Sequence, residues 1–194
     1  MNENLACKDE PYQEPWREEL IAGKRVAMAP ASTNHNRIAS RIFSIFDRYL
    51  EGKTCEPFAD GMAVFLTEKD YYIPDFMVVC DPDKVQQDGV HGTPDIVVEV
   101  LSPSTAQRDR GRKKDVYERC GVKEYWIVNP REKSVEQYIM TDGKYQIFGV
   151  YTLYAEKDVE EMTPNDRAAV VTEFKCSLYD DLIIRLEDIF RRVP

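Results

Sequence analysis

Hydrophobic residues recur along this chain with two periods, and each period predicts one kind of element. In residues 33–50 apolar side chains return every three or four positions, which predicts an amphipathic helix capped by Thr33 or Asn34. The apolar face of this helix consists of Ile38, Ile42, Phe43, Ile45, Phe46 and Leu50. Short runs rich in branched and aromatic residues predict strands at residues 54–58, 62–66, 73–80, 96–101 and 124–128.

The remaining pattern predicts how these strands are connected. A second helix is expected at residues 105–120, and a polar loop at 81–93. Residues 134–140 and 144–150 should form a hairpin because Asp142-Gly143 suits a tight turn. A strand at 182–184 and a short helix at 186–191 follow. Antiparallel strands leading through a crossover helix to a further strand are typical of an α/β (α+β) fold, a mixed β-sheet flanked by helices.

Composition bounds the class of protein. The chain has 194 residues, 43% of them hydrophobic, which is typical of one globular domain. Residues 1–20 are mostly polar and are expected to be a lead-in, so the domain is placed at residues 21–194. No apolar run approaches the roughly 20 residues that span a bilayer, and the N-terminus lacks a secretory pattern. We therefore expect no membrane partner and a cytoplasmic location.

Cysteine spacing suggests neither a zinc site nor a disulfide framework. There are five cysteines, without any CxxC pair, at positions Cys7, Cys55, Cys80, Cys120 and Cys176. The expectation is reduced thiols, with Cys80 and Cys120 in the core.

Net charge argues against a general polyanion binder. The formal charge is −9, whereas nucleic-acid binders usually carry a basic footprint. Residues 108–114 nevertheless hold five cations and one anion. A local basic strip beside an acidic site is compatible with this distribution.

Glu99 is the most informative single residue, because it places a carboxylate inside a strand that reads as buried. An ionised carboxylate there is costly unless it is paired or binds a metal. Asp75 and Glu99 each lie twelve residues from Gln87, so symmetric antiparallel pairing would put them opposite each other. Opposed Cβ atoms lie about 5 Å apart, close enough for both carboxylates to share one cation.

Two further charged residues follow from the same patterns. Lys113 lies three, four and seven residues before Val116, Tyr117 and Cys120, so it should point along the inward stripe of the second helix. Asp109 precedes Lys113 by four residues and could hold its ammonium group. Asp95 is about 13 Å from Glu99 along the strand, too far to bind the same ion. It is expected to cap the strand entry, with a supporting role left open.

Two carboxylates, a hard cation and a lysine suit phosphodiester hydrolysis. Mg²⁺ (or Mn²⁺) prefers oxygen ligands, and the backbone carbonyl of Val100 could add one. A lysine can orient the attacking water or stabilise charge growing on the phosphate. The alternative is structural: Asp75 and Asp95 begin strands after prolines, and Glu99 pairs with Lys113 or an arginine.

Two other residues have a structural reading first. His35 falls in the first turn of the first predicted helix, where a histidine is more often structural or solvated than functional. Tyr117 is expected in the core with its hydroxyl satisfied.

At these positions the chain resembles the Uma-type restriction endonuclease family, within the PD-(D/E)XK nuclease superfamily. The resemblance covers residues 28–186. It is densest at Pro74-Asp75, in residues 94–105, along the helix carrying Asp109, Lys113 and Tyr117, and in residues 121–130. It implies a restriction-endonuclease-like core with the acidic cluster at one edge of the sheet.

The resemblance also implies roles for individual residues. Asp75 stands at the motif aspartate and Glu99 at the motif glutamate. The lysine that normally follows two residues later is Leu101 here, and Lys113 matches a lysine that this family carries on the following helix. His35 falls on a recurrent position of the first helix.

The expected function is therefore a Mg²⁺-dependent endonuclease that hydrolyses phosphodiester bonds of nucleic acid, with DNA as the first choice and a homodimer as one form. The alternative, favoured by the sequence pI of about 4.9, is a catalytically degenerate nuclease-fold protein that binds nucleic acid or regulates. A third reading is hydrolysis of a small phosphoester or nucleotide, which would relieve the charge problem.

Overall fold

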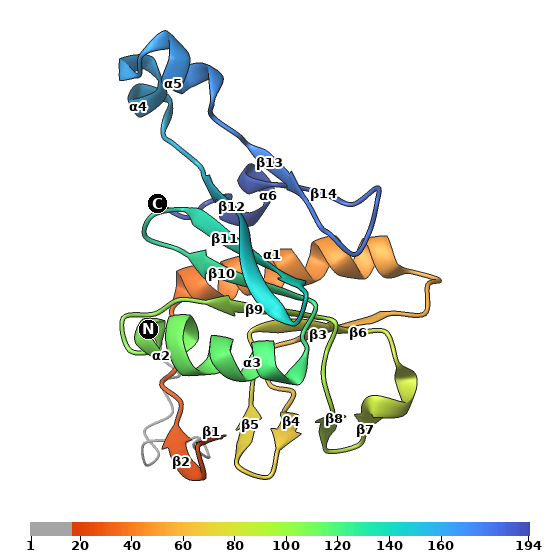
Figure 1. Cartoon of the computed structure of the whole chain (residues 1–194). Helices are drawn as coiled ribbons and strands as arrows, with labels where there is room; N and C mark the ends of the chain where they lie inside the picture. The colour runs from red at the N-terminus through yellow and green to blue at the C-terminus, as the bar shows by residue number, and fades with distance from the viewer. Residues whose placement is uncertain (1–16) are drawn as a thin grey trace, which may run out of the picture.

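A computed structural model describes residues 17–194 of the chain and shows a mixed central sheet flanked by helices (Figure 1). The central sheet has the order β12-β11-β10-β9-β6-β3. Its strands are β3 (Glu56–Ala59), β6 (Phe76–Val79), β9 (Ile96–Val100), β10 (Glu124–Asn129), β11 (Ser134–Thr141) and β12 (Lys144–Thr152). Only β9 and β10 pair in parallel, so this sheet is mixed as predicted.

A second six-stranded sheet, with the order β2-β1-β5-β4-β8-β7, lies at the lower end of the view in Figure 1. Its strands are β1 (Glu18–Ile21), β2 (Lys24–Ala27), β4 (Val64–Thr67), β5 (Asp70–Tyr72), β7 (Val85–Gln86) and β8 (Gly89–His91). A short 3-10 turn, η1 (Pro82–Lys84), precedes β7. The sequence pattern missed β1, β2, β5, β7 and β8, each of which is two to four residues long.

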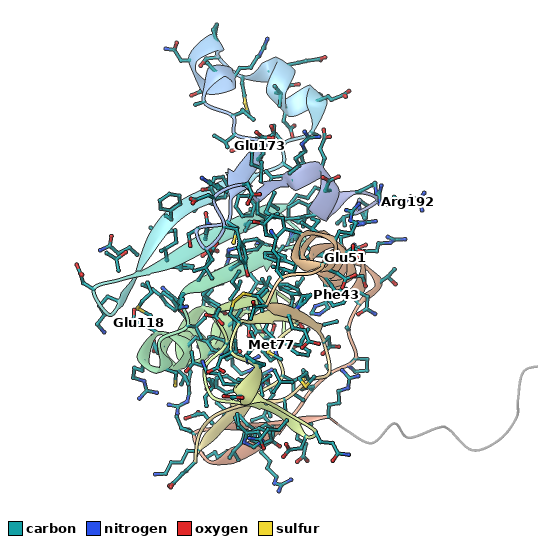
Figure 2. The ribbon with its side chains drawn as sticks, turned by 90° about the vertical axis from the view of Figure 1, so that its right-hand side faces the viewer. Phe43, Glu51, Met77, Glu118, Glu173 and Arg192 are labelled. Carbon is teal, nitrogen blue, oxygen red and sulfur yellow. A yellow bond between two sulfur atoms is a disulfide. The ribbon has the colours of Figure 1, made fainter. Side chains whose placement is uncertain are left out.

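Helices cover both faces of the central sheet. Helix α1 (Thr33–Leu50) and α6 (Leu186–Phe190) pack on one face, together with the small hairpin β13 (Glu173–Lys175) and β14 (Ile183–Arg185). Helix α3 (Lys114–Cys120) covers the other face, where the second sheet also packs. Figure 2 shows side chains filling both layers.

Two short helices, α4 (Glu156–Glu161) and α5 (Pro164–Ala168), lie apart from both sheets, at the top of Figure 1. Among the described residues, no helix is long and apolar enough to cross a membrane.

Three local expectations need correction. The cap of α1 is Ser32, whose side chain accepts a hydrogen bond from the backbone N–H of His35, and not Thr33 or Asn34. The predicted helix at 105–120 is interrupted: α2 (Ala106–Arg108) leads into a π-helical turn, η2 (Asp109–Lys113), where Gly111 leaves helical geometry before α3 begins. The polar lead-in to residue 20 is too long, because β1 already begins at Glu18.

The cysteine prediction was wrong for one pair. Cys55 and Cys80 form a disulfide, because β3 and β6 pair with Glu56 opposite Val79 and the two cysteines are the next opposed positions. Cys120 is only half-buried, whereas Cys176 is buried and free. Cys7 lies outside the described residues.

Candidate active site

Strand pairing brings Asp75 and Glu99 together at one end of the central sheet. Phe76 on β6 lies opposite Val98 on β9, so the next pair in this antiparallel register is Asp75 and Glu99. This is the alignment that symmetric pairing predicted. Both side chains are buried, with residue exposures of 6% and 3%. The backbone N–H of Val100 donates to Asp75 Oδ2 at 2.6 Å, which ties the carboxylate to the end of β9.

Lys113 reaches Glu99 from the helical layer. Its Nζ lies 2.9 Å from Glu99 Oε1, and the whole residue is only 4% exposed. The inward direction follows from the spacing on α3, where Val116 and Tyr117 are fully buried against the same layer. The prediction that Lys113 points along the inward stripe is confirmed.

A residue that the sequence pattern did not single out, Glu19, completes the ion cluster. Glu19 Oε1 lies 2.7 Å from Lys113 Nζ and also accepts the backbone N–H of Ile73 at 3.0 Å. The residue is buried on β1, on the same side of that strand as Ile21. A signal was present: two four-residue runs flank Ala22-Gly23, a hairpin turn in which both residues have positive φ.

Tyr117 and His35 each hold one of the paired carboxylates. The Tyr117 hydroxyl donates to Glu99 Oε1 at 2.8 Å, so this oxygen accepts from both Tyr117 and Lys113. His35 Nε2 lies 2.9 Å from Asp75 Oδ1. The first turn of α1 thus points a histidine at Asp75. His35 is therefore not solvated, and this contact is compatible with either a structural or a functional role.

Asp109 lies at the start of the π-helical turn and is the least satisfied member of the group. It is 1% exposed, and its Oδ1 is 3.9 Å from Lys113 Nζ, which is beyond hydrogen-bonding distance. Within residues 17–194 this oxygen has no hydrogen-bond partner. A buried carboxylate oxygen without a partner is costly, so this atom has capacity for a further ligand.

Burial and mutual repulsion set the electrostatics of the cluster. Burial raises the pKa of the Glu99 carboxyl well above its ordinary value, against the opposing charge of Lys113, and neighbouring carboxylates add to the rise. Burial likewise raises the pKa of Asp109. Burial disfavours the charged form of Lys113, but the surrounding carboxylates outweigh it and raise the pKa of that amine.

The same two effects, burial and neighbouring charges, set the pKa of His35, whose protonated form is a cation. Burial alone would lower the pKa of the imidazole. The hydrogen bond and charge of Asp75, with the charges of Asp60 and Asp109, outweigh burial and raise the pKa above its ordinary value of 6.5. The protonated form of His35 is therefore favoured next to Asp75.

Asp95 lies outside this group, at the opposite end of β9. Its Oδ2 accepts the backbone N–H of Cys80 at 2.7 Å, and its Oδ1 pairs with Lys123 Nζ at 2.7 Å. These bonds join the ends of β6, β9 and β10, which agrees with the predicted strand-entry role. The contacts give Asp95 no part in the cluster around Glu99.

The donor set suits a hard divalent cation by its chemistry. Four buried carboxyl groups face one lysine and one histidine, so acidic side chains outnumber basic ones by two; the acidic residues are Glu19, Asp75, Glu99 and Asp109. Among residues 17–194, no three His, Cys, Asp or Glu side chains are already arranged as a metal-ligand set. The fit therefore rests on the opposed pair Asp75 and Glu99, the excess of acidic side chains and the unsatisfied oxygen of Asp109.

Comparison with known proteins agrees with this architecture. The sequence profile of the Uma2 family, described as "Putative restriction endonuclease", matches residues 7–171. A crystal structure described as "a putative nuclease belonging to DUF820 from Anabaena variabilis ATCC 29413" superposes with a TM-score of 0.66 at 18% identity, covering 93% of each chain. At that identity the likeness establishes the fold.

Two proteins of the cyanobacterium Synechocystis are also similar in sequence. Uncharacterized protein slr1290 is 32% identical over 135 residues, covering 68% of this chain and 71% of its own. Uncharacterized protein sll1609 is 28% identical over 126 residues, covering 63% and 71% respectively.

Proposed function

The chain belongs to the Uma2 family of restriction-endonuclease-like proteins, and on that premise we propose that it is a metal-dependent endonuclease acting on DNA. One observation carries the proposal: Asp75 and Glu99 are directly opposed, with Lys113 Nζ 2.9 Å from Glu99. Two carboxylates on adjacent strands and a lysine beside one of them are the parts that hydrolysis of a phosphodiester requires.

Asp75, Glu99 and the backbone carbonyl of Val100 are the groups that would hold Mg²⁺ or Mn²⁺. Their oxygen atoms suit a hard cation. The hydrogen bond from the Val100 N–H to Asp75 holds the Asp75 carboxylate next to Val100, whose carbonyl is the third group. When bound, such an ion would supply Lewis-acid polarisation of the phosphate and a more acidic water.

The protein's own groups have separate tasks in this proposal. Lys113 stabilises negative charge growing on the phosphate, or orients the attacking water, once its contact with Glu99 loosens. Tyr117 positions Glu99 through its 2.8 Å hydrogen bond. His35 positions Asp75 in the same way, because its Nε2 lies 2.9 Å from Asp75 Oδ1.

Cleavage of supercoiled and single-stranded DNA with Mg²⁺ or Mn²⁺ tests the proposal. Asp75→Asn and Glu99→Gln should each reduce cleavage about 100-fold or more, because each removes a charged ligand. Asp95→Asn is the matched control, since it changes a buried carboxylate on the same strand outside the cluster. Full activity in Glu99→Gln would contradict the proposed site.

Failure of the wild-type protein to cleave DNA, combined with no Mn²⁺ binding by calorimetry, would leave a nuclease fold that binds nucleic acid without cutting it.

The proposal also includes a homodimer, since cutting both strands of a duplex would use two sites. Light scattering during the cleavage experiment measures this directly.

A further inference from the structure

A group of four arginines lies on the exposed side of α1 and on the segment that follows α6. Arg37 and Arg41 are one turn apart on α1, and Arg191 and Arg192 follow α6. Arg37 Nη1 donates to the backbone carbonyl of Arg192 at 3.0 Å, which holds the two segments together. Arg41 Nη1 likewise donates to the carbonyl of Ile189 at 3.4 Å. We call these four residues the arginine patch.

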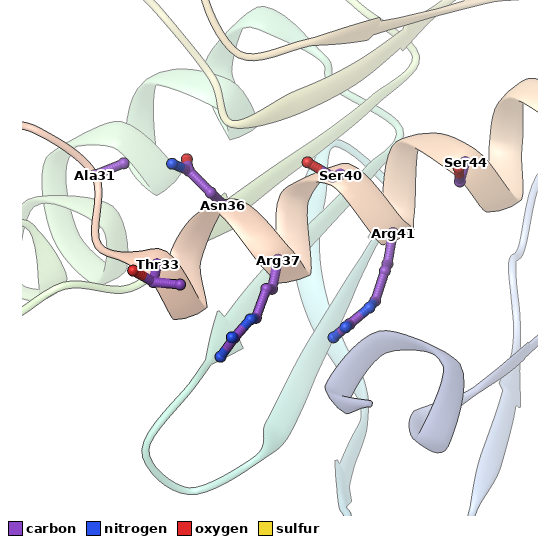
Figure 3. Close-up of a pocket in the computed structure, with 7 residues that line it drawn as sticks. All are labelled: Ala31, Thr33, Asn36, Arg37, Ser40, Arg41 and Ser44. Atoms are coloured by element: carbon purple, nitrogen blue, oxygen red, sulfur yellow. The ribbon is translucent and has the colours of Figure 1, made fainter. Parts of the chain in front are cut away.

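Arg37 and Arg41 line a shallow, open hollow of about 540 Å³ along α1 (Figure 3). The rest of its lining is Ala31 and four small polar side chains, Thr33, Asn36, Ser40 and Ser44. Figure 3 shows Arg37 and Arg41 projecting from the same side of the helix, with Arg41 directed toward α6. Hydroxyl, amide and guanidinium donors arranged along one groove suit an acceptor-rich, negatively charged ligand.

Like charges gather here without acidic partners. Within residues 17–194, no carboxylate lies within 4.0 Å of any guanidinium of the arginine patch. Burial lowers the pKa of Arg41, and the positive charges of Arg191, Arg37 and Arg192 lower it further, so its main charged neighbours are cations. Such clustering of like charges opposes folding, and a bound anion would relieve the repulsion.

The basic strip expected at residues 108–114 is mostly paired. Arg110 pairs with Glu136 at 2.5 Å, Arg112 with Asp70 at 3.1 Å, and Lys113 is enclosed by the carboxylates of the site. Of its five cations, only Arg108 and Lys114 have no carboxylate within 4.0 Å among residues 17–194, and Lys114 lies over the Tyr138 ring. The arginine patch keeps most of its donors available.

The patch and the candidate active site lie on different sides of α1. His35, which contacts Asp75, is in the first turn of α1, two residues before Arg37. At about 100° of turn per residue, Arg37 and Arg41 are rotated by roughly 200° and 240° from His35, so they project from the side of the helix away from Asp75. Phosphates along one DNA strand are spaced about every 3.4 Å of duplex axis, so nearby phosphates of one strand could contact both arginines.

We propose that the arginine patch and the polar outer face of α1 bind the phosphodiester backbone of the nucleic-acid substrate, at a surface separate from Asp75 and Glu99. This inference rests on the proposed function, because it identifies a second surface that holds the substrate of that site. Contacts to phosphates carry no base identity, so binding there is independent of sequence.

Fluorescence anisotropy of a labelled duplex, with EDTA present to prevent cleavage, tests the proposal. The binding constant is measured over a KCl series for wild type, Arg37→Gln/Arg41→Gln and the control Arg119→Gln/Lys157→Gln. The control removes the same charge from exposed positions on α3 and α4. Thermal unfolding of each variant confirms that it is folded.

We expect the patch variant to bind about tenfold or more weakly near 0.1 M KCl, while the control stays within about threefold of wild type. The slope of log K against log[KCl] should fall in magnitude by about 0.9 for each lost phosphate contact. Arg191→Gln/Arg192→Gln should weaken binding in the same manner. This second variant leaves α1 unchanged, so it separates lost contacts from a disturbed helix.

Two results would overturn the proposed role of the arginine patch. One is equal binding of DNA by the patch and control variants, and the other is no binding of DNA by wild type. The first result with normal Mg²⁺-dependent cleavage leaves the proposed nuclease standing and places the substrate elsewhere. Weakened binding by the patch variants, together with cleavage that Glu99→Gln does not affect, would keep the patch and refute the proposed site.

Discussion

Lys113 is the shared counter-ion of a buried acidic cluster, and this determines what its removal does. Its amine lies 2.7 Å from Glu19 and 2.9 Å from Glu99, with Asp109 at 3.9 Å. Removing a cation from such a group leaves buried carboxylates uncompensated, which costs more than the pair itself contributes. Loss of activity in a Lys113 variant therefore does not by itself identify a chemical role.

We predict that Lys113→Ala lowers the free energy of unfolding by about 3–5 kcal/mol at pH 8, measured by urea denaturation. The loss should shrink near pH 5, because the raised pKa values of Glu99 and Asp109 allow these groups to take up protons. Lys114→Ala is the matched control. Lys114 is half-buried over the Tyr138 ring at 4.0 Å, and its loss should cost about 1 kcal/mol or less. Equal effects of the two substitutions would contradict the counter-ion role.

His35 gives a pH dependence of the opposite sense. Its pKa in the folded protein is raised above the ordinary 6.5, so the charged contact with Asp75 contributes full stability below that value. The contribution is lost as the pH rises through the folded pKa. Wild type should therefore exceed His35→Gln in unfolding free energy by more at about pH 6 than at about pH 9, in EDTA.

Proton NMR provides the direct measurement for His35. The imidazole should titrate above 6.5 in wild type, and Asp75→Asn should lower its pKa because burial then acts against a weaker opposing charge. An unchanged titration in Asp75→Asn would show that Asp75 does not hold the imidazolium.

At the scale of elements, the hydrophobic pattern predicted the helices and strands that are long enough to show a period. Helix α1 has five buried residues at helical spacing over eighteen positions, and its bounds match the expectation. The hairpin of β11 and β12 turns at Asp142-Gly143, where both residues have positive φ. The strand β9 was equally clear, because its five residues are all buried.

Short elements and tertiary pairing explain the rest. Strands of two or three residues, such as β5 and β7, have too few positions for a period to appear. Glu19 escaped notice because a charged residue at an inward position hides the alternation that would have shown β1. The candidate pair Asp75 and Glu99 could be proposed from spacing, but only the β6–β9 register establishes their opposition.

The disulfide between Cys55 and Cys80 ties the ends of β3 and β6, at the edge of the central sheet. A bridge that closes 25 residues is expected to stabilise a protein by about 3 kcal/mol, mainly by restricting the unfolded chain. We predict that dithiothreitol lowers the unfolding free energy of wild type by this amount, and leaves Cys55→Ser/Cys80→Ser unaffected. Equal sensitivity of both proteins to the reductant would place the effect elsewhere.

At the scale of the whole molecule, the net charge hides two regions of opposite local charge. Four acidic side chains with only two basic partners are concentrated at the sheet end, whereas the four arginines on α1 and after α6 have no carboxylate within 4.0 Å among the described residues. A divalent cation and a phosphate backbone would balance these two regions respectively. The net charge of −9 therefore gives no direct measure of affinity for nucleic acid, which depends on the local surface.

The excess of acidic side chains predicts metal binding that can be measured without any substrate. Mg²⁺ at ten times its dissociation constant should raise the unfolding free energy of wild type by about 1.4 kcal/mol. Asp75→Asn and Glu99→Gln should lose this gain, whereas Asp95→Asn should keep it, because Asp95 lies at the other end of β9.

The affinity for Mg²⁺ should weaken as the pH falls from about 8 to about 6. Protons then compete with the ion for Glu99 and Asp109, the carboxyl groups whose pKa values are raised. Calorimetry in two buffers of different ionisation enthalpy measures the protons released on binding. Mg²⁺ affinity that is independent of pH, or that survives in Glu99→Gln, would mean that the ion binds away from this cluster.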